Sequence, residues 1–158
     1  MSHTALTCKS EYIILRDGVR LAVSTWLGKE SAKNTGKRPA VVVTTRYWRA
    51  MAFKQDKPEF QPYYPIASYL WARGYVFVAA DVRGSGASFG HREVEVPQAE
   101  IEDISEVVEW AARQPWCDGR VATTGQSCTA NTTLYSSVNA PSVLKLGVCR
   151  AADLDWYR

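Results

Sequence analysis

Two different apolar patterns divide the chain into an early and a later region. In the early region, residues 12–15 and 19–26 are rich in apolar side chains, and Val19, Leu21 and Val23 alternate with polar or small neighbours. An Asp-Gly pair lies between the two runs and favours the tight turn of a β-hairpin. We therefore expect an antiparallel hairpin with one polar face at the start of the domain.

Continuous apolar runs follow, as expected for strands that are covered on both faces. The sequence predicts such strands over residues 39–45, 75–80, 121–124 and 144–149. Helical spacing predicts helices over residues 62–73, 97–114 and 129–138. Strands that alternate with helices indicate βαβ units, so we expect an α/β fold with a mainly parallel sheet and flanking helices.

The composition is that of a globular protein. The 158 residues suffice for one domain with a core, and 46% are hydrophobic against 22% charged. The net charge of +3 is spread along the chain, which argues against nucleic-acid binding. There is no apolar run long enough for a membrane span, and residues 1–11 lack the apolar centre of a signal peptide. We expect a soluble, cytoplasmic protein that binds neither nucleic acid nor membranes.

The cysteines and histidines do not suggest a metal site. The cysteines lack CxxC spacing, and only two histidines accompany them. Scattered thiols fit a reducing compartment better than a disulfide framework. We therefore expect neither a metal nor another cofactor. The four thiols belong to Cys8, Cys117, Cys128 and Cys149.

One serine lies where a predicted strand ends and a predicted helix begins. Gly125 precedes Ser127 by two positions, and a small residue there permits the sharp turn of a nucleophile elbow. The following helix would direct its first amide groups at the reacting oxygen. Two interpretations of Ser127 remain open here: it is a nucleophile, or its hydroxyl is the N-cap of that helix. The glycine that usually follows the serine by two positions is replaced by Thr129.

Several motifs, in order along the chain, resemble those of a known family. They are Arg-Asp-Gly-Val-Arg-Leu at 16–21, Arg-Gly-Tyr-Val-Phe-Val at 73–78, Asp-Val-Arg-Gly-Ser-Gly at 81–86 and Gln-Pro-Trp-Cys-Asp-Gly-Arg-Val at 114–121. With the serine turn, they resemble the N-terminal portion of the cocaine esterase and Xaa-Pro dipeptidyl-peptidase-like hydrolases, the CocE/NonD group. The resemblance implies the N-terminal part of an α/β-hydrolase fold, over residues 1–158. It also implies a serine hydrolase that cleaves ester, amide or peptide bonds through an acyl-enzyme.

The resemblance assigns roles at three positions. It places the nucleophile on Ser127, in a turn that is usually Gly-x-Ser-Tyr-x-Gly; Cys128 stands where Tyr is usual, and Ala130 where the last Gly is usual. The backbone N–H of Cys128 would form half of the oxyanion hole, and the hydroxyl of Tyr47 the other half. Arg46 replaces the usual proline before that tyrosine. The alternatives are that Tyr47 only anchors its loop and that the Cys128 thiol is the nucleophile.

Other charged residues have weaker claims to a catalytic role. Asp81 and Arg83 follow a predicted strand, and we expect a short-range ion pair between them to brace their loop. His91 as a general base, and Asp153 or Asp155 as the acid, are minor hypotheses. Loop histidines are commonly only solvated, and aspartates at such positions also suit a helix start.

Members of the family are several times longer, and their acid and histidine follow the serine. The chain ends at Arg158, before the cap and C-terminal domain that the resemblance implies. We expect part of a longer hydrolase, nearly inactive alone, because serine needs a general base. The strand at 144–149 would be an unpaired apolar edge that favours self-association. The competing hypothesis is a non-catalytic α/β module that binds a partner or ligand.

Overall fold

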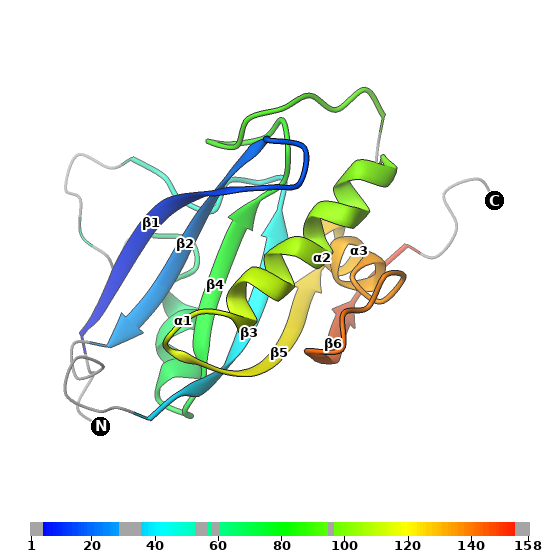
Figure 1. Cartoon of the computed structure of the whole chain (residues 1–158). Coiled ribbons are helices and arrows are strands. Elements are labelled where there is room, and N and C mark those ends of the chain that lie inside the picture. The colour runs from blue at the N-terminus through cyan, green and yellow to red at the C-terminus, as the bar shows by residue number, and fades with distance from the viewer. Residues whose placement is uncertain (1–4, 29–35, 53–56, 58–60, 95–96, 154–158) are drawn as a thin grey trace.

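The computed structural model describes residues 5–28, 36–52, 57, 61–94 and 97–153. Strands and helices alternate along these residues after an initial hairpin (Figure 1). The strands are β1 (Leu6–Ile14), β2 (Arg20–Gly28), β3 (Arg38–Thr45), β4 (Val76–Asp81), β5 (Cys117–Gln126) and β6 (Leu144–Arg150). The helices are α1 (Tyr64–Trp71), α2 (Gln98–Ala112) and α3 (Cys128–Tyr135).

The strands form one mixed sheet in the order β1-β2-β4-β3-β5-β6. The β1–β2 hairpin is antiparallel, and β2 pairs antiparallel with β4. From β4 to β6 all neighbours are parallel. The predicted α/β fold, with a hairpin followed by a mainly parallel sheet, is confirmed.

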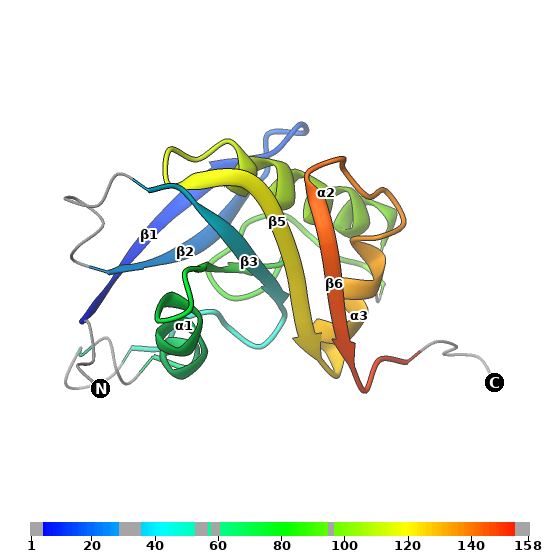
Figure 2. The ribbon, with the colours of Figure 1, turned by 90° about the horizontal axis from the view of Figure 1, so that it is seen from below.

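The strand order determines which face each helix covers. The connection from β3 to β4 runs toward the hairpin, whereas those from β4 to β5 and from β5 to β6 run the other way. Because such crossovers are right-handed, α1 must cover one face, and α2 and α3 the other. Figures 1 and 2 show this three-layer arrangement. Because β4, β3, β5 and β6 run parallel, their carboxyl ends lie at one edge of the sheet. Ligands bind at this edge in open α/β sheets.

The core lies between the sheet and both helical layers. Val42 and Val78 are completely buried on the central strands, and Trp26 and Phe77 are 1% exposed. Val107 and Val108 of α2 are also completely buried. These side chains account for the continuous apolar runs of the sequence, because the central strands have no solvent-exposed face.

Strand β1 begins at Leu6, earlier than the predicted start at residue 12. Its first half alternates little and contains Lys9, Ser10 and Glu11, all of them polar. An edge strand tolerates such residues because one of its sides faces solvent. Similarly, β5 begins at Cys117 rather than at residue 121, where the apolar run starts.

A cluster of buried ion pairs joins the hairpin turn to α2. Arg83, in the loop after β4, donates from Nε and Nη2 to the two carboxylate oxygens of Asp103, at 2.5 and 2.6 Å. Its Nη2 also donates to Asp17 in the hairpin turn, at 2.9 Å. Arg16 donates to Asp103 at 3.1 Å. Since Arg83 is 7% and Asp103 2% exposed, these charges depend on each other for solvation.

Replacing Asp103 with Asn should destabilise the fold by about 3 kcal/mol, because Arg83 would remain buried without a matching negative charge. The matched control is Glu102→Gln, which removes a carboxylate that contacts Arg16 at 2.5 Å but is 40% exposed. We expect its effect to stay below about 1 kcal/mol. Urea unfolding followed by circular dichroism measures both. Equal effects of the two substitutions would contradict the importance of burial.

The carboxylate of Asp17 in the hairpin turn should make the stability of the fold depend on pH. The hydrogen bond from Arg83 lowers the pKa of Asp17 below its usual value of 3.8. A carboxylate with a lowered folded-state pKa stabilises the fold above its unfolded-state pKa, and loses this effect as the pH falls through the folded-state value. Thermal unfolding from pH 7 to pH 2 should show that Asp17→Asn lowers the melting temperature at neutral pH. Below about pH 4 the difference from the parent protein should shrink. A difference that stays constant over this range would contradict the assignment.

Candidate active site

Ser127 lies in the sharp turn between β5 and α3. Its backbone has φ 57° and ψ −127°, a conformation that a non-glycine residue adopts only under constraint. The N–H of Ser127 donates to the carbonyl of Arg150 at 3.0 Å, which ties the turn to the end of β6. The residue is exposed at the carboxyl edge of the parallel strands. The expected tight bend between a buried strand and a helix is confirmed.

Close backbone contact explains the glycine two positions before the serine. A Cβ at Gly125 would lie 2.0 Å from the carbonyl oxygen of Thr129, well inside van der Waals contact. Thr129, which stands in the place of the usual second glycine, also closes the turn through its hydroxyl. Its Oγ1 accepts from the N–H of Gln126 at 2.7 Å and donates to the Gln126 carbonyl at 2.9 Å. The departure from the usual pattern therefore supplies additional bonds within the turn.

The alternative interpretation of Ser127 as a side-chain cap is wrong. Ser127 occupies the N-cap position of α3, but its side chain makes no capping hydrogen bond. Its carbonyl instead accepts from the N–H groups of Ala130 and Asn131, at 2.8 and 3.1 Å. Ser127 therefore occupies the N-cap position without using its hydroxyl as the cap.

Cys128 is the first residue of α3, so the helix itself offers its N–H no acceptor. Such an amide, at the positive end of a helix, is suited to bind a developing oxyanion. The Cys128 side chain is 8% exposed, whereas Ser127 is exposed. Burial of this thiol argues against the hypothesis that Cys128 is the nucleophile.

Tyr47 lies in the turn directly after β3, the neighbour of β5. Val42 pairs with Thr123, so continuing this register brings Thr45 opposite Gln126, next to the serine turn. The Tyr47 N–H donates to Thr45 Oγ1 at 2.9 Å, and Trp48 has a positive φ of 65°. Tyr47 is 64% exposed. An exposed ring at this edge is a poor structural anchor and a suitable position for a substrate contact.

Arg46, where the family usually has proline, holds this turn through a buried ion pair. Its Nη2 lies 3.0 Å from Oε1 of Glu100 in the first turn of α2, and Glu100 is completely buried. Arg92 lies 3.6 Å from the other carboxylate oxygen. The Arg46 carbonyl also accepts from Ser85 Oγ at 2.9 Å. Side-chain and backbone bonds thus fix the residue that precedes Tyr47.

Tyr63 is a residue at this edge that the sequence did not indicate. Burial raises the pKa of its hydroxyl above the usual 10.0, and a hydrogen bond with Thr45 opposes this shift. It also interacts electrostatically with Cys128 and Asp81, which places it among the strand ends and the start of α3. A tyrosine in the first turn of a predicted helix carries no distinguishing pattern. At neutral pH its hydroxyl stays protonated and can donate.

Asp81 and Arg83 brace loops, as expected, but not by pairing with each other. Asp81 accepts the Arg49 N–H at 2.7 Å and the Ala87 N–H at 3.1 Å, whereas Arg83 binds Asp103. The expected ion pair between Asp81 and Arg83 is therefore wrong. Asp81 is the last residue of β4, whereas Arg83 lies in the loop after it, and each binds a different segment of the chain.

The structure describes the surroundings of two residues that the sequence offered as a base and an acid, His91 and Asp153. The Phe89 N–H donates to the Arg20 carbonyl at 2.9 Å, and a Cβ at Gly90 would lie 3.1 Å from Val19. The loop that leads to His91 therefore packs on β2, on the opposite side of β4 from β3 and β5. Asp153 is exposed, and its backbone N–H donates to Asn131 Oδ1 of α3 at 2.9 Å. His3 and Asp155 lie outside the described residues.

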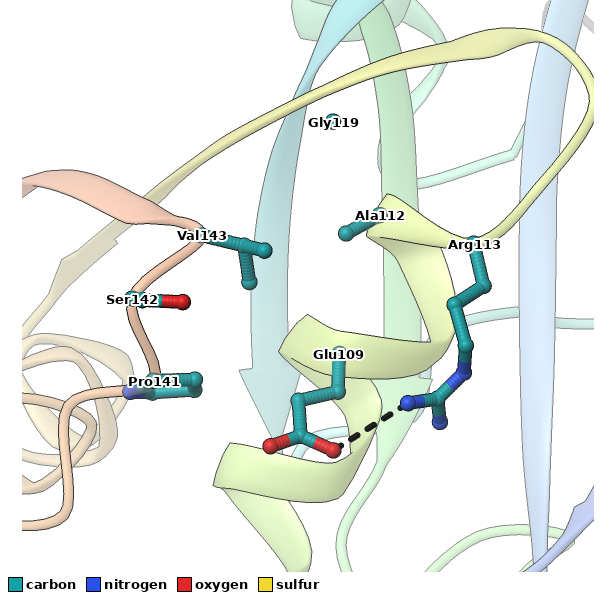
Figure 3. Close-up of a pocket in the computed structure, with 7 residues that line it drawn as sticks. All are labelled: Glu109, Ala112, Arg113, Gly119, Pro141, Ser142 and Val143. Atoms are coloured by element: carbon teal, nitrogen blue, oxygen red, sulfur yellow. Dashed lines mark hydrogen bonds and ion pairs between the residues drawn. The ribbon is translucent and has the colours of Figure 1, made fainter.

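A hollow of about 300 Å³ lies at the opposite end of the molecule (Figure 3). It is bounded by the end of α2, the start of β5 and the segment before β6. Glu109 and Arg113, one turn apart at the end of α2, form an ion pair at 3.2 Å along one wall of the hollow (Figure 3). It is lined by Glu109, Ala112, Arg113, Gly119, Pro141, Ser142 and Val143. Since this hollow faces the amino ends of the strands, it is separate from Ser127.

Two further features of the described residues concern membranes and metals. Among the helices of the described ranges, none combines the length and apolar character that crossing a bilayer needs. Within the same ranges, no three His, Cys, Asp or Glu side chains are grouped so as to hold a metal ion.

Comparisons with known proteins agree with this geometry. The sequence model of the X-Pro dipeptidyl-peptidase (S15 family) matches residues 17–158. A Mycobacterium bovis protein named as a serine esterase is 36% identical over 148 residues, covering 87% of this chain and 23% of that protein. The crystal structure of a CocE/NonD family hydrolase from Staphylococcus aureus has a TM-score of 0.68 at 26% identity, covering 89% of this chain and 27% of that one.

A fourth comparison concerns the fold alone. An α-amino acid ester hydrolase superposes with a TM-score of 0.75 at 21% identity, over 99% of this chain and 27% of its own. The chain thus spans about a quarter of the length of each of these three relatives. The match over most of the sequence, together with the serine turn at the carboxyl edge of the sheet, places this chain in the X-Pro dipeptidyl-peptidase (S15) family of α/β hydrolases.

Proposed function

We propose that Ser127 is the nucleophile of a serine hydrolase that cleaves ester or amide bonds. The observation that carries this proposal is the backbone of Ser127, held at φ 57° between a buried strand and a helix. Strain of this kind persists only where surrounding contacts impose it, and it is common at catalytic residues. Here it presents the hydroxyl to solvent at the edge where α/β enzymes bind their substrates.

The reaction would proceed through an acyl-enzyme. Oγ of Ser127 attacks the carbonyl carbon of the substrate and passes its proton to a general base. The carbonyl oxygen becomes an oxyanion, which the Cys128 N–H and the Tyr47 hydroxyl stabilise by hydrogen bonds. The intermediate collapses, the C–O or C–N bond breaks, and the leaving alcohol or amine takes the proton. Water then attacks the acyl-enzyme in the same way and releases the acid.

The mechanism needs a general base, and His91 is the one histidine among the described residues. Of the two histidines in the sequence, His91 follows a loop that packs against β2, and His3 lies outside the described residues. Loss of a triad histidine in a serine protease lowers kcat by about a million-fold. We therefore propose that this chain by itself turns over substrate only marginally.

The substrate class follows from the family and its named members. The family takes its name from X-Pro dipeptidyl-peptidases, whereas the Mycobacterium bovis relative is named as an esterase. Both activities use one acyl-transfer mechanism and differ in the leaving group. We propose an ester, amide or peptide substrate. The competing proposal, a non-catalytic module that binds a partner, predicts no covalent chemistry at Ser127.

The serine turn should not tolerate a side chain at residue 125. Gly125→Ala should destabilise the protein by about 2–4 kcal/mol, because the new methyl group would displace the Thr129 carbonyl and the start of α3. Gly119→Ala is a useful comparison: nothing lies within 4 Å of its Cβ, and only its φ of 88° opposes the change. Chemical denaturation measures both variants. A Gly125→Ala protein as stable as Gly119→Ala would refute the tight turn.

Covalent labelling tests the nucleophile. Prolonged incubation with a fluorophosphonate at high concentration should modify Ser127 slowly, as identified by mass spectrometry of the modified peptide. Ser127→Ala should lose this modification. Cys128→Ala is the matched control, because it removes the thiol but keeps the backbone N–H, and it should label like the parent chain. Unchanged labelling in Ser127→Ala, or none in a folded parent chain, would favour the non-catalytic module.

Ester turnover tests the proposed lack of a base. Release of p-nitrophenol from p-nitrophenyl acetate by the parent chain should exceed that by Ser127→Ala only slightly. The same assay with His91→Ala should give the parent rate. Fast turnover that disappears in His91→Ala would show that His91 is the base and that the chain is catalytically complete.

A further inference from the structure

The turn after β3 is held at two points by the last residues of neighbouring strands. Thr45 and Asp81 are register partners at the carboxyl ends of β3 and β4, and they are 0% and 2% exposed. Thr45 Oγ1 accepts from the N–H of Tyr47 at 2.9 Å, and Asp81 Oδ1 accepts from the N–H of Arg49 at 2.7 Å. These two buried side chains are the anchors of the turn, one on either side of Trp48.

Trp48, between the two anchors, has a backbone conformation that a large side chain seldom adopts. Its φ is 65°, in the left-handed region, where the Cβ of an L-residue crowds the following carbonyl. Such a conformation persists only where surrounding contacts impose it. A negative φ at Trp48 would rotate the Arg49 N–H relative to the Tyr47 N–H, and the two groups would no longer meet both acceptors. The two bonds to the anchors therefore account for the strain.

The Asp81 carboxylate is itself held in place. Its Oδ2 accepts from the N–H of Ala87 at 3.1 Å, and the Nε of Arg49 lies 3.6 Å from the same oxygen. A Cβ at Gly86 would overlap Oδ2 of Asp81, so the loop after β4 packs directly on the carboxylate. Arg49 Nη1 in turn donates to Ser24 Oγ of β2 at 2.8 Å. One carboxylate thus joins the turn after β3 to the loop after β4.

We propose that Thr45 and Asp81 are positioning residues that hold the Tyr47 hydroxyl where the oxyanion forms. The inference rests on the proposed function, in which this hydroxyl and the Cys128 N–H bind the oxyanion. Continuing the register of β3 and β5 brings Thr45 opposite Gln126, so the anchored turn begins beside the serine turn. A donor that is held in place before the reaction stabilises the developing charge without reorganisation. The two anchors act through the backbone of the turn and do not touch the substrate.

Asp103 is a matched case for a carboxylate that only braces the fold. Like Asp81 it is 2% exposed and binds arginine side chains. Its partners, however, are Arg83 in the loop after β4 and Arg16 in the hairpin turn. Asp103→Asn should therefore lower stability without changing the position of Tyr47.

The rate of fluorophosphonate labelling at Ser127 measures the proposed effect, because the phosphoryl oxygen occupies the oxyanion hole. Tyr47→Phe should slow labelling by about 30-fold, and Thr45→Val and Asp81→Asn should each slow it by about tenfold. Both anchor variants keep the size of the side chain, but valine offers no acceptor, and asparagine offers one oxygen where the carboxylate offers two. Asp103→Asn should label at the parent rate. Circular dichroism identifies the variants that are folded under the labelling conditions.

Two further readouts separate positioning from a general loss of structure. If the anchors act through Tyr47, adding either anchor variant to Tyr47→Phe should slow labelling no further, whereas independent effects would multiply. Alkylation of Ser127→Cys by iodoacetamide forms no oxyanion. In a Cys149→Ser background, each anchor variant should change its rate by less than about twofold, because access and thiolate content stay the same.

The outcomes distinguish this inference from the proposed function. No labelling of the parent chain, or labelling of Tyr47→Phe at the parent rate, would overturn the proposed role of Ser127 or of Tyr47, and this inference with it. Slow labelling in Tyr47→Phe, with parent rates in folded Thr45→Val or Asp81→Asn, would overturn this inference alone. An equal slowing in Asp103→Asn, or multiplied effects in the double variants, would also overturn it. Because the anchor variants change separate side chains, the test remains decisive if one of them does not fold.

Discussion

The structure depends on one close backbone contact, between the α-carbon of Gly125 and the carbonyl oxygen of Thr129. The end of β5 and the first turn of α3 approach so closely that no side chain fits between them. This approach forces Ser127 into a positive φ and places it at the surface. The Thr129 hydroxyl closes the turn with two bonds to Gln126, and Thr132 Oγ1 donates to the Thr44 carbonyl of β3 at 2.9 Å. The strained serine is therefore supported from both strands beside it.

Buried charges hold the loops at the same edge of the sheet. Arg83 joins the loop after β4 to α2 and to the hairpin turn, and Arg46 joins the turn after β3 to the start of α2. Ion pairs of this type add little net stability compared with apolar packing, but losing one partner is costly. Their effect is to fix loop positions. The turn that carries Tyr47 is thus held by a buried ion pair, whereas the turn that carries Ser127 is held by the hydrogen bonds of Thr129.

The sequence predicts the architecture well because its signals are local and periodic. Continuous apolar runs located the central strands, and Asp17-Gly18 located the hairpin turn. The glycine before Ser127 pointed to a backbone approach that the structure contains. Polar edge strands such as the first half of β1 escape this reasoning, since solvent on one side removes the apolar pattern. The first residues of β5, 117–120, lie outside the predicted strand because they include the polar residues Asp118 and Arg120.

The partners of charged side chains could not be predicted, because they are far apart in the chain. Arg83 binds Asp103 and Asp17 rather than Asp81, and Arg46 binds Glu100, through contacts that only the fold creates. Tyr63 reaches the site edge by the same long-range packing. The sequence could therefore predict features that depend on local backbone geometry, such as the serine turn. It could not predict side-chain partners that depend on contacts between distant segments.

The central claim is that residue 127 presents its side chain to solvent at the positive end of α3. The most direct test is the rate at which Ser127→Cys reacts with iodoacetamide as a function of pH, in a Cys149→Ser background. The account predicts rapid alkylation with an apparent thiol pKa below the usual value of about 8.5, because the helix terminus stabilises the thiolate. A thiol that is protected from the reagent, or that titrates at or above that value, would contradict it.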